Sequence, residues 1–312
     1  MLKADLDTLL DLLEVRLDAF AMCEIERACS LVCPPLDGVV VHFVLRGEGA
    51  VSCEHGVFPL KAGSMIVVPR RLEKTISGLG PILKVVPADA ACPMTDGIVR
   101  FRACEGEADL VLGCASVEAR VGEAFGLFDH LAAPLVEESS DPALAMLFEG
   151  MLAELSQPKV GTRALVGTMM KHVLILLLRA HMERRGTQSP LYMPLMNPQL
   201  GKALVAIVAQ PQAPHSLESL ARLTGMSRSR FTHHFTATYG RSPMHFVQSV
   251  RLRAGGRLLR SSGLPIKSIA AAVGYASRSH FSRAFRAEFG VDPTGYREGF
   301  AGEEGLTLQA AE

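Results

Sequence analysis

Two short segments of the chain carry similar sets of basic and hydrogen-bonding side chains. The first reads GMSRSRFTHHF from Gly225, and the second reads GYASRSHFSRAF from Gly274. Helical spacing places the two phenylalanines of each segment on one face. The opposite faces then carry Ser229, Thr232, His233 and Thr236 in the first segment and Ser279, Ser282, Arg283 and Arg286 in the second. Such side chains bond to phosphates and to base edges, so these faces suggest contact with a nucleic acid.

The two segments belong to a longer duplicated unit. Leu220-Ala221 precedes the first segment as Ile269-Ala270 precedes the second. Each copy predicts a short helix, a glycine-containing turn and a second helix that begins after Ser227 or Ser277, which is the pattern of a helix-turn-helix. The connector SPMHFVQSVRLRAGGRLLRSSG predicts one helix of roughly 18 residues, about 27 Å long. This length suits two helices that enter successive major-groove faces ~34 Å apart.

The charge of the chain is divided along its length. Residues 196–300 hold 14 basic and 4 acidic side chains, whereas residues 1–195 hold 18 basic and 25 acidic ones. A basic block beside an acidic one predicts that only the C-terminal part meets a polyanion. The alternative for this part is a helical bundle whose basic faces are merely solvated. The duplication, the connector and the local charge together favour binding of DNA.

The N-terminal part reads first as strands and then as helices. Short strands with Gly and Pro punctuation from about Val39 to Ala119 favour a sandwich or barrel. Asp141, followed by a proline, is typical of a helix N-cap, and a second helix is expected over 162–186. That second helix is strongly apolar, so it is expected to pack on the barrel or on its twin in a second chain. Residues 187–198 are the expected linker.

The first twenty residues predict an amphipathic helix and no secretory signal. Leu6, Leu9, Leu10, Leu13 and Leu17 follow helical spacing, and no small-residue cleavage site follows them. The longest apolar run, 173–178, is far shorter than the roughly 20 residues that span a membrane. We therefore expect a cytoplasmic protein without a membrane partner.

Residues 216–298 resemble the AraC/XylS family of bacterial transcription regulators. The resemblance rests on LARLTGMSRSRFTHHF, RLRAGGRLL and IAAAVGYASRSHFSRAFRAEFGVDPTGYR. The upstream part resembles the subgroup with an N-terminal cupin sensor. The fold so implied is α+β: a cupin-like β-barrel followed by helices, then an all-α double helix-turn-helix. The implied domains are a sensor over 1–128, a helical dimerisation and linker segment over 129–190, and a DNA-binding domain over 199–300.

The resemblance also implies which residues meet DNA. By position, the groove-facing side chains are Ser229, Thr232 and His233 in the first helix, and Arg278, Ser279, His280 and Arg283 in the second. Arg228 and Arg278, near the helix N-termini, are alternatively phosphate contacts. His233 stands where relatives often carry Arg, so the second helix is expected to be the main reader. The implied partners are double-stranded DNA, a second copy of the chain and, for an activator, RNA polymerase.

The barrel segment offers too few ligands for a metal. GSMIVVP, from Gly63, resembles the second cupin motif, but Lys74 stands where that motif commonly places a histidine. The first motif offers His42 alone, and one histidine cannot build a catalytic metal site. We therefore predict no enzyme, no catalytic residue, no metal and no cofactor. His42, Arg70, Arg71 and Lys74 are candidates for binding an anionic effector; the alternatives are a core histidine and a solvated charge run.

All seven cysteines precede residue 115: Cys23, Cys29, Cys33, Cys53, Cys92, Cys104 and Cys114. Their spacing matches no zinc knuckle. Buried, reduced thiols that fill the core explain most of them. Because the cysteines are confined to the sensor half, Cys29 and Cys33, beside Pro34-Pro35, are candidates for sensing of oxidants, electrophiles or soft metals.

The sequence thus predicts a DNA-binding transcription regulator controlled by a small molecule or a redox signal at its cupin-like domain. Two alternatives remain open. One is a small-molecule-binding cupin without a metal, and the other is a constitutive DNA binder whose barrel serves only to dimerise.

Overall fold

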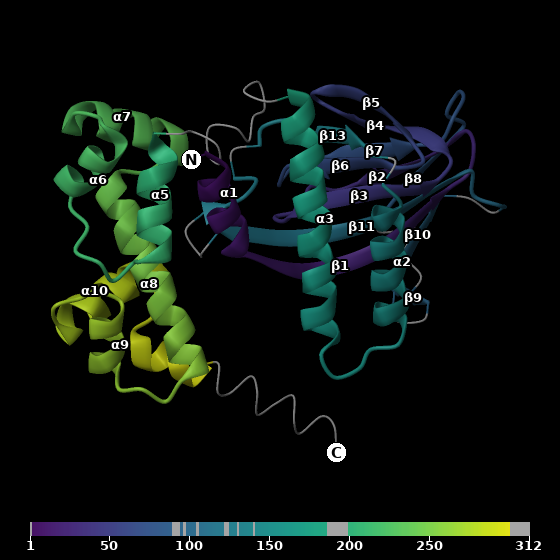
Figure 1. The fold of residues 1–312 in the computed structure, drawn as a ribbon. Helices are drawn as coiled ribbons and strands as arrows, with labels where there is room; N and C mark the ends of the chain where they lie inside the picture. The colour runs from purple at the N-terminus through teal and green to yellow at the C-terminus, as the bar shows by residue number, and fades with distance from the viewer. Residues whose placement is uncertain are drawn as a thin grey trace, which may run out of the picture. The chain divides into compact units, whose positions relative to one another are not determined.

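The computed structural model describes residues 2–88, 94–95, 98–103, 106–121, 125–129, 131–139, 141–185 and 199–299. Contacts divide the chain into two compact units (Figure 1). One consists of residues 14–119 and 127–192. The other joins the helices from residue 193 onward to the first 13 residues and to residues 120–126. The sequence-based domain ranges differ from this division by placing the N-terminal helix with the barrel.

Two β-sheets form the first unit. The larger has the order β13-β6-β3-β11-β1-β10-β9, with β12 paired to β11, and the smaller has the order β5-β4-β7-β2-β8. The strands of the larger sheet are β1 (Leu13–Ile25), β3 (Val39–Arg46), β6 (Ser64–Val68), β9 (Met94–Thr95), β10 (Ile98–Ala103), β11 (Leu110–Val121), β12 (Phe125–Gly126) and β13 (Leu135–Glu138). Those of the smaller sheet are β2 (Cys29–Cys33), β4 (Glu48–Cys53), β5 (Gly56–Lys61), β7 (Lys74–Ser77) and β8 (Lys84–Pro87).

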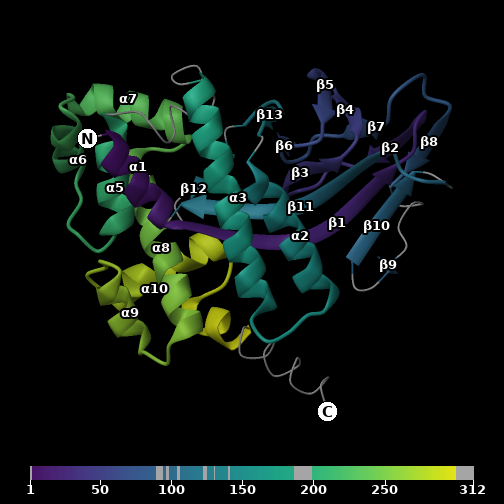
Figure 2. The ribbon, with the colours of Figure 1, turned by 45° about the vertical axis from the view of Figure 1, so that its right-hand side comes forward.

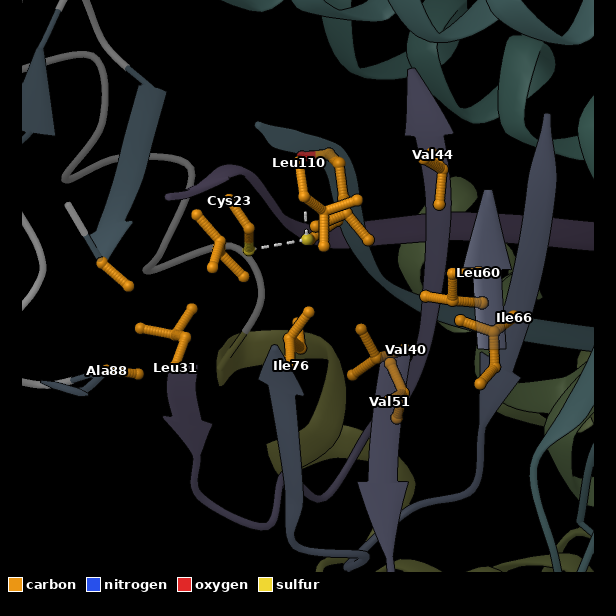
Figure 3. Close-up of a cluster of buried hydrophobic side chains, with 14 of the residues drawn as sticks. Cys23, Leu31, Val40, Val44, Val51, Leu60, Ile66, Ile76, Ala88 and Leu110 are labelled. Carbon is orange, nitrogen blue, oxygen red and sulfur yellow. Dashed lines mark hydrogen bonds between the residues drawn. The ribbon is translucent and has the colours of Figure 1, made fainter. Parts of the chain in front are cut away.

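The core of this unit lies between the sheets, and alternation along the strands decides which side chains enter it. On β3, Val40 and Val44 belong to the core cluster together with Leu31 and Ile76 of the smaller sheet (Figure 3). His42 lies between those two valines and shares their face. A polar side chain therefore points into a mainly apolar interior.

Helices α2 (Pro142–Ser156) and α3 (Thr162–Arg185) pack side by side (Figures 1 and 2). Asp141 caps α2 as expected, because its carboxylate accepts a hydrogen bond from the Ala143 amide at 2.9 Å. On α2, Phe148 stacks on Phe43 of β3 with ring centroids 4.8 Å apart, so α2 covers the outer face of the larger sheet. Near the end of α3, His181 bonds to Glu137 of β13 at 2.5 Å.

Helix α3 is the one described helix that is long and apolar enough to cross a membrane, a test that buried core helices also meet. Its apolar side chains at Leu174 and Leu177 are buried within the chain itself. The helix thus packs on its own unit, which was one of the two expected arrangements. Leu165, 45% exposed, is the main apolar side chain that the helix leaves open.

The N-terminal segment departs from the predicted helix. Helix α1 covers Leu2–Asp11, and the chain continues as strand β1 from Leu13. The predicted helix therefore extends too far, because Leu13 and Leu17 belong to strand β1 of the larger sheet despite their helical spacing. Strands β1 and β2 precede the expected start of the barrel at Val39, and β12 and β13 follow its expected end at Ala119.

The second unit is all-helical beyond β12. Helix α1 packs on α5. The remaining elements are α5 (Leu200–Ala209), α6 (Leu217–Thr224), α7 (Arg228–Tyr239), α8 (Pro243–Ser261), α9 (Ile266–Ala272) and α10 (Arg278–Phe289). The central helix α8 has 19 residues, close to the predicted 18, and contacts both α7 and α10 (Figure 1). This is the expected double helix-turn-helix.

Candidate nucleic-acid interface and barrel cavity

The second helix of each copy begins and ends by the same local rules. The Ser227 hydroxyl accepts from the Arg230 amide at 3.4 Å, and the Ser277 hydroxyl accepts from the His280 amide at 3.2 Å. Such N-caps satisfy amides that the helix itself leaves unpaired. Gly240 and Gly290 end the helices in the left-handed conformation. The sequence therefore determines α7 and α10 locally, as predicted.

Buried aromatic side chains orient both helices. Phe231 and Phe235 of α7 and Phe281 and Phe285 of α10 are fully buried, with ring centroids 5.4 Å apart within each pair. Since these faces point into the core, the opposite faces point to solvent. The burial predicted from phenylalanine spacing is confirmed.

The outer face of α7 carries the predicted side chains. Arg228, Ser229 and His233 are exposed, and Thr232 is half-buried with its hydroxyl donating to the Arg228 carbonyl at 2.9 Å. These four residues border an open hollow of about 880 Å³. Thr236 lines the same hollow. The face is therefore accessible, but its side chains are short and carry a single arginine.

The side chains on the outer face of α10 reach farther than those on α7. Arg278, Ser279 and Arg283 are exposed on it, and Arg286 continues the same stripe. His280 is exposed too, but its ring lies edge-on to Tyr275 with centroids 5.2 Å apart. Because His280 follows Ser279 by about 100° around the helix, it lies at the flank of the stripe rather than at its centre.

The arginines of this unit fall into two groups. Arg251 donates to the carbonyls of Pro211 and Ala213 at 2.8 and 2.7 Å, and Arg241 donates to the Ser249 hydroxyl. Arg251 joins α8 to the loop before α6, and Arg241 joins the turn before α8 to that helix. Among the described residues, Arg228, Arg278 and Arg283 have no ion-pair partner. These three guanidinium groups are on the two outer faces, where a polyanion can reach them.

His42 is one of two buried polar side chains that line a cavity in the barrel. The cavity has a volume of about 480 Å³ and is walled mainly by apolar side chains. His42 is 2% exposed, its Nδ1 lies 3.0 Å from Cys114 Sγ, and its Nε2 has no hydrogen-bond partner in the described structure. Burial, aided by the charge of Lys74, holds the pKa of His42 well below its ordinary value. The imidazole is therefore neutral at pH 7.

Lys74 is the second buried polar side chain of the cavity, and it enters from the opposite sheet. It pairs in register with Cys33 of β2, which also lines the cavity, and is 3% exposed. No carboxylate within the described ranges forms an ion pair with it. The cavity therefore combines an apolar wall with a buried ammonium and an unsatisfied ring nitrogen. Among the residues that the structure describes, no group of three or more His, Cys, Asp or Glu side chains is arranged to hold a metal ion.

The structure separates the other sequence candidates from this cavity. Arg70 pairs with Asp129 and Arg71 pairs with Asp37, each at 2.9 Å. Arg71 is also one of the two positions with positive φ outside glycine in the described chain. Of the four effector candidates, His42 and Lys74 line the barrel cavity, while Arg71 lines a separate surface hollow that Lys74 also borders.

The cysteines divide in the same way. Cys29 is buried in the core cluster, Cys33 lines the cavity, and Cys92 and Cys104 lie outside the described residues. Sequence reasoning missed Cys23 and Cys114, which line the cavity and whose sulfurs lie 2.8 Å apart. They are 91 residues apart in sequence, and no local signal brings them together.

Two family models match the chain. One, described as a helix-turn-helix domain, covers residues 220–299, and one described as cupin covers residues 5–183. The chain is 26% identical over 302 residues to the HTH-type transcriptional regulator MtrA of Neisseria gonorrhoeae, which covers 94% of this chain and 97% of that protein.

Two further similarities cover parts of the chain. The RCS-specific HTH-type transcriptional activator RclR of Escherichia coli is 32% identical over 138 residues, 44% of this chain and 49% of that protein. An AraC-type DNA-binding domain protein from Chromobacterium violaceum is a solved structure with a TM-score of 0.32 and 29% identity, covering 33% of this chain and 93% of that one.

Proposed function

Since this chain belongs to the AraC/XylS family of DNA-binding transcription regulators and carries a cupin domain, we propose that α10 is its main reader of DNA sequence and that the barrel cavity receives the signal that controls it. The role of α10 rests on one observation: the guanidinium group of Arg283, at the centre of the α10 stripe, is exposed. The second part of the proposal rests on Lys74, which is buried without an ion-pair partner among the described residues, and on the unsatisfied Nε2 of His42.

Arg283 is suited to read a base, because a guanidinium can donate two bonds to the O6 and N7 atoms of guanine. Such a contact discriminates by about 1–3 kcal/mol. His233, the equivalent residue of α7, has a shorter reach. Ser229 and Thr232 beside it read bases only at close approach, through water or through a thymine methyl group. The first helix therefore adds affinity and a weaker preference.

Arg228 and Arg278 are proposed to contact phosphates. Each is the first residue of its helix, next to amides that attract anions. Helix α8, with 19 residues, is about 28 Å long and can hold the two recognition helices one turn of DNA apart. A single chain then binds two adjacent major-groove faces on one side of the duplex.

Genome-wide mapping of binding sites tests this reading of DNA. We expect an enriched motif with two half-sites about one helical turn apart, of which one half is better defined and contains guanine. Repeating the mapping with Arg283→Ala should blur that half alone. A wild-type motif confined to one half-site, or a motif unaltered by the substitution, would overturn the assignment.

The signal proposed for the cavity is a small, largely apolar molecule with an anionic or hydrogen-bond-accepting end. A buried ammonium without a counter-charge is costly, and an anionic group of a ligand offsets that cost. The unpaired Nε2 of His42 offers a second contact in the same space. The cavity volume of about 480 Å³ lies within the range typical of small-molecule sites.

Thermal unfolding with a panel of probes tests the cavity. We expect aromatic or medium-chain carboxylates to raise the Tm of the wild-type chain, the matched primary amides to raise it less, and Lys74→Met to abolish the difference. Arg71→Met, which removes an exposed cation paired elsewhere, is the matched control. If no probe distinguishes Lys74→Met from wild type, the anionic-ligand proposal fails and a barrel that serves only assembly is favoured.

We also propose that the chain acts in the cytoplasm as a homodimer and an activator that contacts RNA polymerase. Its relative RclR is named a transcriptional activator. On helices α2 and α3, the exposed apolar side chains Met146 (70%) and Leu165 (45%) are candidates for a dimer contact, whereas Leu174 and Leu177 are buried within the chain. Leu165→Glu should therefore lower the mass measured by light scattering without unfolding the barrel. A wild type that is monomeric at micromolar concentration contradicts the dimer.

A further inference from the structure

Two thiols from neighbouring strands are in contact inside the barrel. Cys23 lies on β1 and Cys114 on β11, both are buried and reduced, and their sulfurs are 2.8 Å apart. The contact is a dashed line from Cys23 in Figure 3. A disulfide bond is about 2.05 Å long, so a small movement of two side chains joins these sulfurs.

The surroundings of the two sulfurs differ. The pKa of Cys23 is raised well above its ordinary value, first by its hydrogen bond to Cys114 and then by burial. The contact with Cys114 and burial thus both favour the neutral thiol form of Cys23. The sulfur of Cys114 also contacts His42 Nδ1 at 3.0 Å. Cys114 is thus the sulfur that contacts both the second thiol and the imidazole.

Cys23 and Cys114 both line the cavity, so a molecule that enters it comes close to them. A small uncharged molecule enters the mainly apolar cavity without the cost of desolvating a charge. The Lys74 ammonium faces the same space and interacts favourably with negative charge on Cys23. Access, a nucleophile and a second thiol thus occur together.

We infer that Cys23, Cys114 and His42 form a redox site, in which a small uncharged peroxide closes the two thiols into a reversible disulfide. The site itself is a chemical property of the barrel. Its effect on transcription rests on the proposed function, in which events in the cavity control DNA binding.

The reaction balances with one peroxide for each disulfide. Cys114 sulfur attacks one oxygen of hydrogen peroxide, the O–O bond breaks, and Cys114 becomes a sulfenic acid while its proton leaves with the second oxygen as water. Cys23 sulfur then attacks Cys114 sulfur, the S–O bond breaks, and the hydroxyl leaves with the Cys23 proton as a second water. Two electrons pass from the two sulfurs to the peroxide. His42 positions Cys114 and takes no lasting part.

Other cysteines fit this chemistry less well. Cys29 and Cys33 are on one strand, four residues and therefore roughly 13 Å apart, so they cannot join each other. Cys33 lines the cavity, but burial raises its pKa to about 12, which leaves it protonated. Cys33 is therefore the matched control: it shares the cavity with the pair but has no described thiol contact.

The experiment treats the full-length chain with hydrogen peroxide, alkylates the remaining thiols and maps peptides by mass spectrometry. We expect the wild type to lose two thiols per chain, to show a linked Cys23–Cys114 peptide, and to recover both thiols with dithiothreitol. Cys33→Ser should behave like wild type. Cys114→Ser should leave Cys23 unoxidised. Cys23→Ser should accumulate a sulfenic acid at Cys114 that dimedone traps, and circular dichroism checks that both variants fold.

Two outcomes overturn the site: no linked Cys23–Cys114 peptide at peroxide doses that leave methionines intact, or a link to another cysteine, Cys92 and Cys104 included. DNA affinity is measured separately by fluorescence anisotropy on the same samples. We expect at least a several-fold change in affinity that dithiothreitol reverses and that Cys114→Ser lacks. If the disulfide forms but the affinity is unchanged, the redox site stands and the proposed control of DNA binding by the cavity fails.

Discussion

The two helix-turn-helix copies share one construction and differ in how tightly it is built. Both recognition helices have a serine N-cap, a buried pair of phenylalanines and a left-handed glycine at the end. They differ in the turn before the helix. Gly225 is followed by one residue before Ser227, whereas Gly274 is followed by Tyr275 and Ala276 before Ser277.

The longer turn ties the second copy more closely to its neighbours. Tyr275 is buried edge-on to Phe281 with ring centroids 5.4 Å apart. Gly274 and Gly225 both have positive φ, but a Cβ on Gly274 would lie 2.9 Å from the Gln212 carbonyl oxygen, while Gly225 has open space around it. A side chain is therefore excluded at Gly274 by crowding as well as by backbone conformation.

The central helix α8 also packs differently against the two copies. Phe246, near its start, contacts Phe235 of α7 ring to ring at 5.3 Å. Gly255, farther along, lets the Phe281 ring of α10 approach to 2.8 Å from where a Cβ would be. The outer faces differ as well, with His233 in one copy where the other has Arg283. The two copies thus share one scaffold, while the closer packing at Gly255 and the long side chain of Arg283 are found in the second copy.

The largest expected effect is on the packing of the recognition helices. Phe281→Ala should lower the free energy of unfolding by about 3–5 kcal/mol, as large-to-small changes of buried aromatics do. Phe231→Ala, the matched change in the first copy, should cost less, because Gly255 offers no side chain to fill the space left at Phe281. Urea denaturation followed by far-UV circular dichroism measures both. Equal costs would break the claim that the second copy is more tightly built.

The turn glycines give the next comparison. Gly225→Ala should cost roughly 1–2 kcal/mol, the price of a left-handed conformation for a residue with a Cβ. Gly274→Ala should cost about 1–3 kcal/mol more, since the added Cβ also overpacks against Gln212. The same denaturation assay serves. Should Gly274→Ala prove no worse than Gly225→Ala, the turn relaxes and the crowding has no energetic weight.

The comparison of outer faces predicts a change in specificity. Arg283→Ala should reduce discrimination between the specific site and a site altered in one half by about 1–3 kcal/mol, hence tenfold or more. His233→Ala should reduce discrimination at the other half by less. Competition anisotropy with the two altered duplexes measures each. An equal loss of affinity for specific and scrambled DNA in Arg283→Ala would identify Arg283 as a backbone contact.

The smallest effect concerns phosphate contacts. Arg228→Ala should weaken binding to all duplexes alike and should lower the slope of log affinity against log salt by about one. Arg222→Ala is the control, because Arg222 is an exposed arginine of α6 that pairs with Glu218 at 3.2 Å. Anisotropy titrations at several salt concentrations distinguish the two. A sequence-dependent loss in Arg228→Ala would move this residue from positioning to reading.

The sequence by itself determined the DNA-binding unit, because its rules are local. Serine caps, phenylalanines four residues apart and terminal glycines act within one or two helical turns. They therefore predicted α7 and α10, their buried faces and the connecting helix α8. The exposed residues Arg283 and Arg228 follow from the same periodicity. The grouping of arginines into paired and unpaired ones did not, because Arg251 finds its carbonyl partners about 40 residues away.

Only the tertiary structure decided which side chains meet inside the barrel. Which face of a strand turns inward depends on its pairing with strands far along the chain, and a shift of one residue reverses every side chain. Leu13 and Leu17 follow helical spacing, yet they belong to strand β1 of the larger sheet. Arg70 and Lys74 lie close in sequence, but the first pairs with Asp129 and the second enters the cavity. Cys23 and Cys114 meet for the same reason: two strands distant in sequence lie side by side in one sheet, with both thiols on the inner face.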